Sequence, residues 1–222
     1  MEIRTTFHKK LKEIQDDIVA MGGMVQEAIS RSIDALKNRD LELAKQIIVD
    51  DHKINKKRFD IEEKCIQLIA TQQPMASDLR TIISVLNIIT EIERIGDYAE
   101  GIAKIVIMIG DEPPLKPLID IPRMAEKTNE MMRRSLEAFI ARDAQAARKV
   151  ALEDDEVDAL YNQVFRELLI YMMEDPRTVS RATRLIWVAH NLERSADRVT
   201  NICERVVYIV TGKMEEIGIS KY

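Results

Sequence analysis

Hydrophobic positions recur every three to four residues along nearly the whole chain, which is the period of an amphipathic α-helix. The pattern is interrupted at only a few points, near Asp40, Pro74, residues 110–117, Asp143 and Pro176. These interruptions divide the chain into six long predicted helices, at about 7–36, 40–71, 76–109, 122–142, 143–174 and 179–211. The pattern therefore predicts an all-α protein.

The second half of the chain repeats the first. Asp40 and Asp143 are separated by an offset of 103, and the motif Glu-Arg-x-x-Asp occurs at 93–97 and again at 193–197, an offset of 100. Each half contains three of the predicted helices, so we expect two tandem three-helix bundles packed side by side. The first unit is expected at residues 1–112, a Pro-rich linker at 113–117 and the second unit at 118–222.

Composition excludes several classes of protein. Only 7 Gly, 6 Pro and 5% aromatic residues in 222 argue against an all-β fold. The net charge of −5 argues against a dedicated nucleic-acid binder. No apolar stretch is long enough to span a membrane, and the N-terminus does not resemble a secretory signal. Cys65 and Cys203 lie among apolar neighbours, as buried reduced thiols do. We expect a cytoplasmic protein without direct membrane insertion.

Acidic residues continue the apolar stripes of two helices. On the third helix the stripe ends in Glu93, Asp97 and Glu100, and on the sixth it includes Glu193 and Asp197. Residues four apart lie on one helix face, so these carboxylates face inward with the stripe. Burial of an unpaired carboxylate costs several kcal/mol, and such residues therefore need a partner.

Positions relative to the turn supply a candidate partner in the first unit. Pro74 lies midway between Asn55 and Glu93, and it also lies midway between Asp51 and Asp97. Equal distances from the turn of an antiparallel hairpin place residues at the same level. We therefore expect these four side chains to meet.

The second unit has the same arrangement. To within a single residue, Pro176 lies midway between Asp158 and Glu193, and midway between Asp154 and Asp197. Oxygen-bearing side chains gathered at one level suit iron, manganese, magnesium or zinc. The candidate metal ligands are Asp51, Asn55, Glu93, Asp97, Glu100, Asp154, Asp158, Glu193, Asp197 and Asn201.

A competing interpretation needs no metal. Arg94 and Arg194 adjoin the acidic residues, and charged residues on helices commonly form salt bridges four residues apart. In that case the acids belong to a structural network paired with arginine. His190 is interpreted as an ordinary helix residue and not as a ligand.

Motifs for catalysis are missing from the sequence. A ferritin-like di-iron site needs Glu-x-x-His on two helices, and none of the three histidines has Glu three residues before it. The sequence also lacks a P-loop, a glycine-rich dinucleotide turn and a Gly-x-Ser-x-Gly elbow. We expect neither an enzyme nor an organic cofactor.

Several ordered motifs resemble the PhoU family, whose members are cytoplasmic regulators of bacterial phosphate uptake. The resemblance rests on Met-Gly-Gly-Met at 21–24, Gln-Pro-x-Ala-Ser-Asp-Leu-Arg at 73–80 and Glu-Ile-Glu-Arg-Ile-Gly-Asp at 91–97. The second half adds Tyr-Met-Met-Glu-Asp at 171–175, Glu-Arg-Ser-Ala-Asp-Arg at 193–198 and Asn-Ile-Cys-Glu at 201–204. At 195–196 the family often has Ile-Gly where this chain has Ser-Ala, outside the acidic positions.

The resemblance implies a function that the residues alone do not. It implies a negative regulator of the phosphate-starvation response, an adaptor between the ATPase subunit of the Pst phosphate transporter and a PhoR-type sensor histidine kinase. It would reach the inner membrane only through these protein partners, and it would form a homodimer.

The resemblance also restricts which metals are expected. It implies multinuclear iron or zinc clusters, with manganese or magnesium as the further options from donor chemistry. The ligands carried over are Asp51, Glu93, Asp97, Asp154, Asp158, Glu193 and Asp197. Two alternatives stay open: a metal-dependent enzyme or metal store built on the helical bundle, and a purely structural scaffold.

Overall fold

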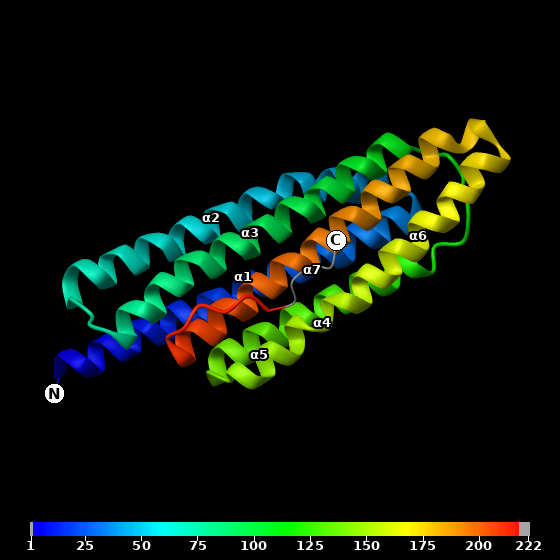
Figure 1. Cartoon of the computed structure of the whole chain (residues 1–222). Helices are drawn as coiled ribbons and strands as arrows, with labels where there is room; N and C mark the ends of the chain where they lie inside the picture. Colours follow the sequence, from blue (N-terminus) through cyan, green and yellow to red (C-terminus); the bar gives the residue numbers. More distant parts are fainter. Residues whose placement is uncertain (1, 218–222) are drawn as a thin grey trace.

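The computed structural model describes residues 2–217, which form an elongated body of long helices (Figure 1). The helices, in chain order, are α1 (Glu2–Asn38), α2 (Leu41–Gln72), α3 (Ser77–Ile109), α4 (Asp120–Ala141), α5 (Ala144–Ala151), α6 (Asp154–Glu174), the short 3-10 helix η1 (Pro176–Thr178) and α7 (Val179–Thr211). The described residues contain no strand, and the predicted all-α fold is confirmed. The connection between α3 and α4 includes the Pro-rich segment.

The turns that follow α1 and α4 have the same construction in both halves. Arg39 and Arg142 adopt left-handed backbone conformations, with φ of 56° and 52°. The next residue, Asp40 or Asp143, then accepts hydrogen bonds from backbone N–H groups of the following helix. These caps satisfy donors that have no partner within the helix and offset the strain of the left-handed residue.

The predicted helix at 143–174 is wrong in its continuity, because the structure divides it into α5 and α6. The chain turns at Leu152 and Glu153, and Asp154 begins a new helix. Glu153 is held by Lys127 and Arg134 of α4, at 2.9 Å and 2.5 Å. Three acidic residues in the first turn of α6 also favour a helix N-terminus there, since they interact well with the helix dipole. In the first unit the equivalent α2 is continuous.

Four helices lie next to one another in the order α2, α3, α7, α6, with α1 and α4 packed behind them (Figure 1). The α2–α3 turn and the α6–α7 turn lie at opposite ends of the body. Among the described residues, α3 and α7 bury the most side chains, because α3 packs against α1, α2 and α7, and α7 packs against α3, α4, α5 and α6. The segment that follows α7 packs back on it, and the backbone N–H of Ile217 donates a hydrogen bond to Glu204 Oε1 at 2.9 Å.

The two units meet through α3 and α7, which run antiparallel. Asn201 donates a hydrogen bond to Glu91 across this contact, at 3.2 Å. At the other end of the contact, a Cβ added at Gly101 would lie 3.2 Å from Asn191 Oδ1. Because the repeat offset is 100, Glu91 corresponds to Asn191 and Gly101 to Asn201. The contact is therefore related to itself by an approximate two-fold axis.

Helices α1 and α4 show the same approximate symmetry. Gln26 Nε2 donates to the backbone oxygen of Asn129 at 2.8 Å, and Asn129 Nδ2 donates to that of Gln26 at 3.2 Å. Near this pair, a Cβ added at Gly22 would overlap the Leu136 side chain. The glycine thus leaves room for the Leu136 side chain where α1 packs on α4, and α1 continues through it without a break.

Candidate metal centres in two carboxylate clusters

In the first unit, the α2–α3 hairpin brings Asp51 of α2 close to the acidic residues of α3. This is what the positions of these residues about the turn predict. Asp51 lies opposite Glu93, Asp97 and Glu100, since the charge of each acts on Asp51. A Cβ added at Gly96 would lie 3.6 Å from Asp51 Oδ1, so the glycine lets α2 approach α3 closely at this level. We call Asp51, Asn55, Glu93, Asp97 and Glu100 the first carboxylate cluster.

Burial and nearby negative charges make Asp51 a weaker acid than an ordinary aspartate. Loss of solvent raises the pKa of Asp51 most, and repulsion from Glu100, Asp97 and Glu93 raises it further, to about 6. Asn55 acts in the opposite direction, because its Nδ2 donates to Asp51 Oδ2 at 2.7 Å. The Asn55 amide therefore acts as a hydrogen-bond donor that stabilises the charged form of Asp51.

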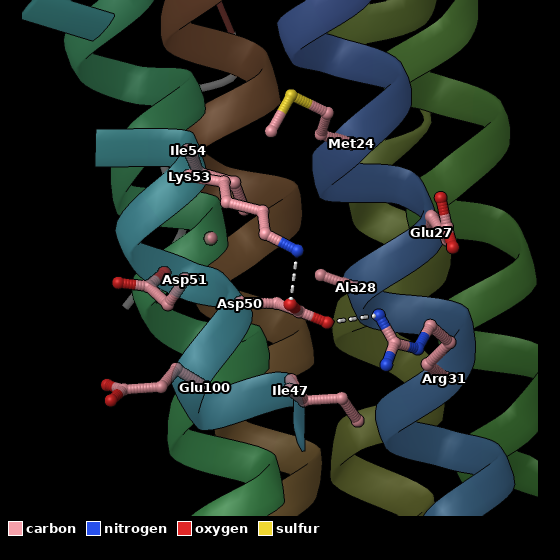
Figure 2. Close-up of a pocket in the computed structure, with 11 residues that line it drawn as sticks. Met24, Glu27, Ala28, Arg31, Ile47, Asp50, Asp51, Lys53, Ile54 and Glu100 are labelled. Carbon is pink, nitrogen blue, oxygen red and sulfur yellow. Dashed lines mark hydrogen bonds and ion pairs between the residues drawn. The ribbon is translucent and has the colours of Figure 1, made fainter. Parts of the chain in front are cut away.

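The adjacent carboxylate, Asp50, has a different environment (Figure 2). It points toward α1 and pairs with Arg31 at 2.9 Å and with Lys53 at 2.6 Å. These hydrogen bonds lower the pKa of Asp50 to about 2. Asp51 and Glu100 point away from α1 in the same view, and all three acids line a cavity of about 190 Å³. Asp50 is therefore paired with basic side chains, whereas its neighbour Asp51 faces other carboxylates.

Basic side chains neutralise part of the first cluster from its edge. Arg94 Nη1 lies 3.0 Å from Asp97 Oδ2, and Lys104 Nζ lies 2.6 Å from Glu100 Oε2. Both basic side chains are about half exposed. These pairs are the arginine and lysine interactions that the competing interpretation expects, and they reduce the negative charge that a cation would meet.

The second cluster lies between α6 and α7 and is the more acidic. Asp154, Asp158, Glu193 and Asp197 act on one another through their charges. Burial, and then repulsion within the cluster, raises the pKa of Asp154 to about 8 and that of Glu193 to about 7. Burial raises the pKa of Asp197 as well, while the charges of Arg194 and Arg198 and a hydrogen bond with Asp154 act to lower it. We call Asp154, Asp158, Glu193 and Asp197 the second carboxylate cluster.

Two further polar residues of the stripe on α7, Asn201 and His190, lie outside the second carboxylate cluster as defined above. Asn201 donates to Glu91 of the first unit, so its hydrogen bond reaches α3 and not the second cluster. His190 Nδ1 lies 3.2 Å from Glu193 Oε2, and its ring lies 6.0 Å from that of Tyr161. Burial lowers the pKa of His190, which keeps the imidazole neutral at pH 7.

Donor chemistry at both clusters fits a cation that prefers oxygen. Four buried carboxylate oxygens of the clusters make no hydrogen bond among the described residues: Glu93 Oε2, Asp154 Oδ1, Asp158 Oδ1 and Glu193 Oε2. Basic nitrogens approach two of them, since Arg94 Nε lies 3.7 Å from Glu93 Oε2 and His190 Nδ1 lies 3.2 Å from Glu193 Oε2. Such oxygens are costly unless a positive group meets them. Across residues 2–217, no three His, Cys, Asp or Glu side chains already converge as a finished ligand set. A cation would therefore have to draw these mutually repelling carboxylates together.

The inter-unit contact between the clusters contains residues that sequence reasoning missed. Tyr98 accepts hydrogen bonds from Arg194 at 3.0 Å and from Arg198 at 3.4 Å, and Arg198 also pairs with Glu91 at 3.2 Å. Tyr98 directly follows Asp97, and Arg198 directly follows Asp197. The network therefore joins helix positions next to both clusters.

A second missed feature recurs in both halves. Arg31 pairs with Asp50, and Arg134 pairs with Glu153. The two arginines are separated by the repeat offset of 103, and so are the two acids. Each acid immediately precedes a cluster residue, Asp51 or Asp154. The signal was present in the sequence, because the basic residue repeats at the same offset as the acids.

Together, these observations define a class of protein: a tandem pair of three-helix units, each with a carboxylate cluster in its last hairpin. The family model of the PhoU domain matches the chain twice, at residues 18–106 and 121–206. The chain belongs to the PhoU family. The family resemblance noted from the motifs is thereby confirmed.

Relatives from distant bacteria resemble nearly the whole chain. The phosphate-specific transport system accessory protein PhoU homolog of Aquifex aeolicus is 42% identical over 206 residues, covering 93% of each chain. The PhoU protein of Escherichia coli is 36% identical, covering 93% of this chain and 86% of that protein.

Solved structures resemble the fold equally well. The crystal structure of PhoU from Pseudomonas aeruginosa has a TM-score of 0.87 and 37% identity, and covers 93% of this chain and all of that one. The phosphate transport system regulatory protein PhoU from Streptococcus pneumoniae has a TM-score of 0.88 and 33% identity, and covers 95% of this chain. Within residues 2–217, none of the helices combines the length and apolar character needed to cross a bilayer.

Proposed function

We propose that the chain is an accessory protein of a phosphate-specific transport system and a negative regulator of the phosphate-starvation response. The observation that carries this proposal is family membership over nearly the whole chain, with relatives named as accessory or regulatory proteins of that system. In this proposal the protein is a cytoplasmic adaptor between the ATPase subunit of the transporter and a PhoR-type sensor kinase, and it forms a homodimer.

Long amphipathic helices suit an adaptor, because they offer extended surfaces to other proteins. When phosphate is plentiful, the adaptor would hold the kinase and transporter in a non-signalling complex. A metal-dependent enzyme or a metal store is the less favoured function, since the relatives' names describe accessory and regulatory proteins.

The proposed role of the carboxylate clusters is to hold iron or zinc ions. Asp51, Glu93 and Asp97 would hold them in the first unit, with Asn55 and Glu100 at the edge. Asp154, Asp158, Glu193 and Asp197 would hold them in the second. A bound cation supplies positive charge to carboxylates that otherwise repel one another. The two helices of each hairpin would then be fixed together at that level.

Regulation is tested by deletion of the gene. We expect a phosphatase reporter to stay highly expressed in phosphate-rich medium, and the wild-type gene on a plasmid to restore repression. Normal repression in the deletion strain would contradict the regulatory function.

Metal content is tested separately, by elemental analysis of untagged protein. We expect stoichiometric iron or zinc in the wild type and its loss in the Asp97→Asn/Asp197→Asn double variant. If neither sample contains metal, the acidic residues form a charged network paired with arginine and lysine.

A further inference from the structure

Apolar side chains are exposed near both hairpin turns. The first apolar patch consists of Ile66, Met75, Leu79 and Ile83, and the second of Phe165, Leu169, Met173, Val179 and Trp187. Met75 is 80% exposed and Met173 is 77% exposed. Groups of exposed apolar side chains mark interaction sites on proteins, whereas single ones are ordinary.

Both patches lie on the helix faces that carry the clusters. Leu79 and Ile83 precede Glu93 by close to four and close to three helical turns, respectively. In the second unit, Phe165 follows Asp158 by close to two turns. Its ring lies 6.4 Å from that of Tyr161, which in turn contacts His190. One broad face, formed by α2, α3, α7 and α6, therefore carries a patch at each end and the clusters between them.

The approximate two-fold axis relates the two patches. Leu79 and Val179 are separated by 100, the offset of α3 and α7, and Ile66 and Leu169 by 103, the offset of α2 and α6. The first pair is 37% and 44% exposed, and the second pair is 55% and 43% exposed. Equivalent apolar positions are thus open in both units, at opposite ends of the body (Figure 1).

We propose that this face binds one symmetric dimer of the ATPase subunit of the transporter, with the same apolar surface of each ATPase copy on one patch. The proposal rests on the proposed accessory function, which supplies the partner. A symmetric dimer presents each surface twice about a two-fold axis. A single chain with an internal two-fold axis matches that geometry, so one chain serves two partner copies.

A lipid surface is a poorer occupant of the same face. The two patches are separated by the carboxylate clusters and by Arg94, which are charged and partly exposed. A flat bilayer that covered both patches would also have to cover these charges, and their desolvation is costly. A folded partner contacts the two ends and leaves the charged middle hydrated.

We do not expect the two patches to contribute equally to binding of the partner. The second patch contains two exposed aromatic residues, Phe165 and Trp187, and the repeat places Glu62 and Asn87 at the equivalent positions of the first unit. The exposed Phe59 of the first unit lies close to two helical turns from Ile66, on the side toward the first cluster. Aromatic residues are enriched among the side chains that contribute most to binding. The second patch is therefore the tighter half of the interface.

The test measures the mass of a complex between the full-length chain and the purified ATPase subunit of the phosphate transporter from the same genome. Light scattering coupled to size-exclusion chromatography is expected to give one chain for every two ATPase copies. We expect Val179→Asp to weaken binding at least tenfold, Leu79→Asp to weaken it less, and the double variant to abolish the complex.

A matched control comes from the opposite face. Val19 on α1 is 44% exposed, as is Val179, so Val19→Asp should leave the complex unchanged. Unfolding temperatures of all variants show whether each is folded. Equal numbers of chains and ATPase copies, or no effect of the patch variants, would overturn the two-fold interface while keeping the accessory function.

The remaining outcomes are also decisive. If the patch variants abolish only self-association, or only binding to vesicles of phosphatidylcholine and phosphatidylglycerol, the face has a different occupant. If the ATPase does not bind the chain, this proposal is overturned; if the sensor kinase does not bind either, the proposed adaptor function fails as well.

Discussion

The two carboxylate clusters occupy equivalent places in a repeated fold but differ in acidity. In the first cluster, Asn55 donates to Asp51, while Arg94 and Lys104 pair with two other members. In the second cluster the position of Asn55 is taken by Asp158, a further acid. The pKa of Asp51 rises to about 6 and that of Asp154 to about 8.

The comparison shows how few changes alter a site without altering its scaffold. Arg194 is the repeat equivalent of Arg94, yet it donates to Tyr98 across the inter-unit contact. Lys104 has an acid, Glu204, as its equivalent. The second cluster thereby lacks the ion pairs that Arg94 and Lys104 make in the first, although the charges of Arg194 and Arg198 still act on Glu193 and Asp197. A cation should bind more tightly there than in the first unit.

Cation affinity should separate the two clusters most strongly. The Asp154→Asn/Asp197→Asn variant should lose affinity for zinc on the order of 100-fold, and the matched Asp51→Asn/Asp97→Asn variant about tenfold. Isothermal titration calorimetry of metal-free protein measures both. Equal losses in the two variants would show that the two clusters do not differ in their affinity for zinc.

Stability of the metal-free protein should depend on pH through the second cluster. Asp154 has a pKa of about 8 when folded against an ordinary value of 3.8, so the folded state binds its proton more tightly. Stability is then greatest at low pH within this window and falls as pH rises toward 8. We expect Asp154→Asn to raise the free energy of unfolding at pH 8 by about 2 kcal/mol, after discounting for partial exposure.

Urea unfolding with a chelator at pH 5.5 and pH 8 checks this dependence. Asp51→Asn is the matched control, and it should change the free energy of unfolding at pH 8 by less than Asp154→Asn does. A wild-type protein that is more stable at pH 8 than at pH 5.5 would contradict the assigned electrostatics.

The first cluster should become more like the second when Asn55 is replaced by Asp. Asn55→Asp removes the hydrogen bond to Asp51 and adds a negative charge beside it. We expect the metal-free protein to lose roughly 1 kcal/mol of stability at pH 8 and to gain affinity for zinc. The reverse variant, Asp158→Asn, should do the opposite in the second unit. Unchanged zinc affinity in both would argue that neither position is a ligand.

The smallest expected effect concerns Asn201. Its hydrogen bond goes to Glu91, so Asn201→Ala should cost about 1 kcal/mol of stability and leave zinc affinity unchanged. Thermal unfolding and calorimetry measure the two quantities. A loss of zinc affinity would place Asn201 in the second cluster after all.

Local patterns in the sequence were sufficient to predict the repeat, the long helices apart from the break within 143–174, and the pairing of Asp51 with Asp97 and of Asp154 with Asp197. The turn at Pro74 fixes the register of α2 on α3, so counting residues placed Asp51 opposite Asp97. The same counting worked across Pro176, because there the distances of paired residues from the turn differ by only one residue. These relations depend only on helix rise and on one turn, which a sequence displays directly.

Features that depend on contacts between distant helices could not be predicted in this way. The break at Leu152 and Glu153 involves Lys127 and Arg134 of α4, whose position relative to α5 has no local signal. The contact of Asn201 with Glu91 depends on the register of α3 against α7, which no short turn sets. The different environments of Asp50 and Asp51 likewise depend on where α1 packs.

The reciprocal hydrogen bonds between Gln26 and Asn129 have a consequence for the origin of the chain. An interface in which two equivalent residues bind each other's backbone is the kind that joins identical subunits. The surface between the units is thus what an ancestral three-helix protein would have used to pair with its own copy before duplication and fusion. Two half-length chains, produced separately, should therefore find each other and assemble as a heterodimer.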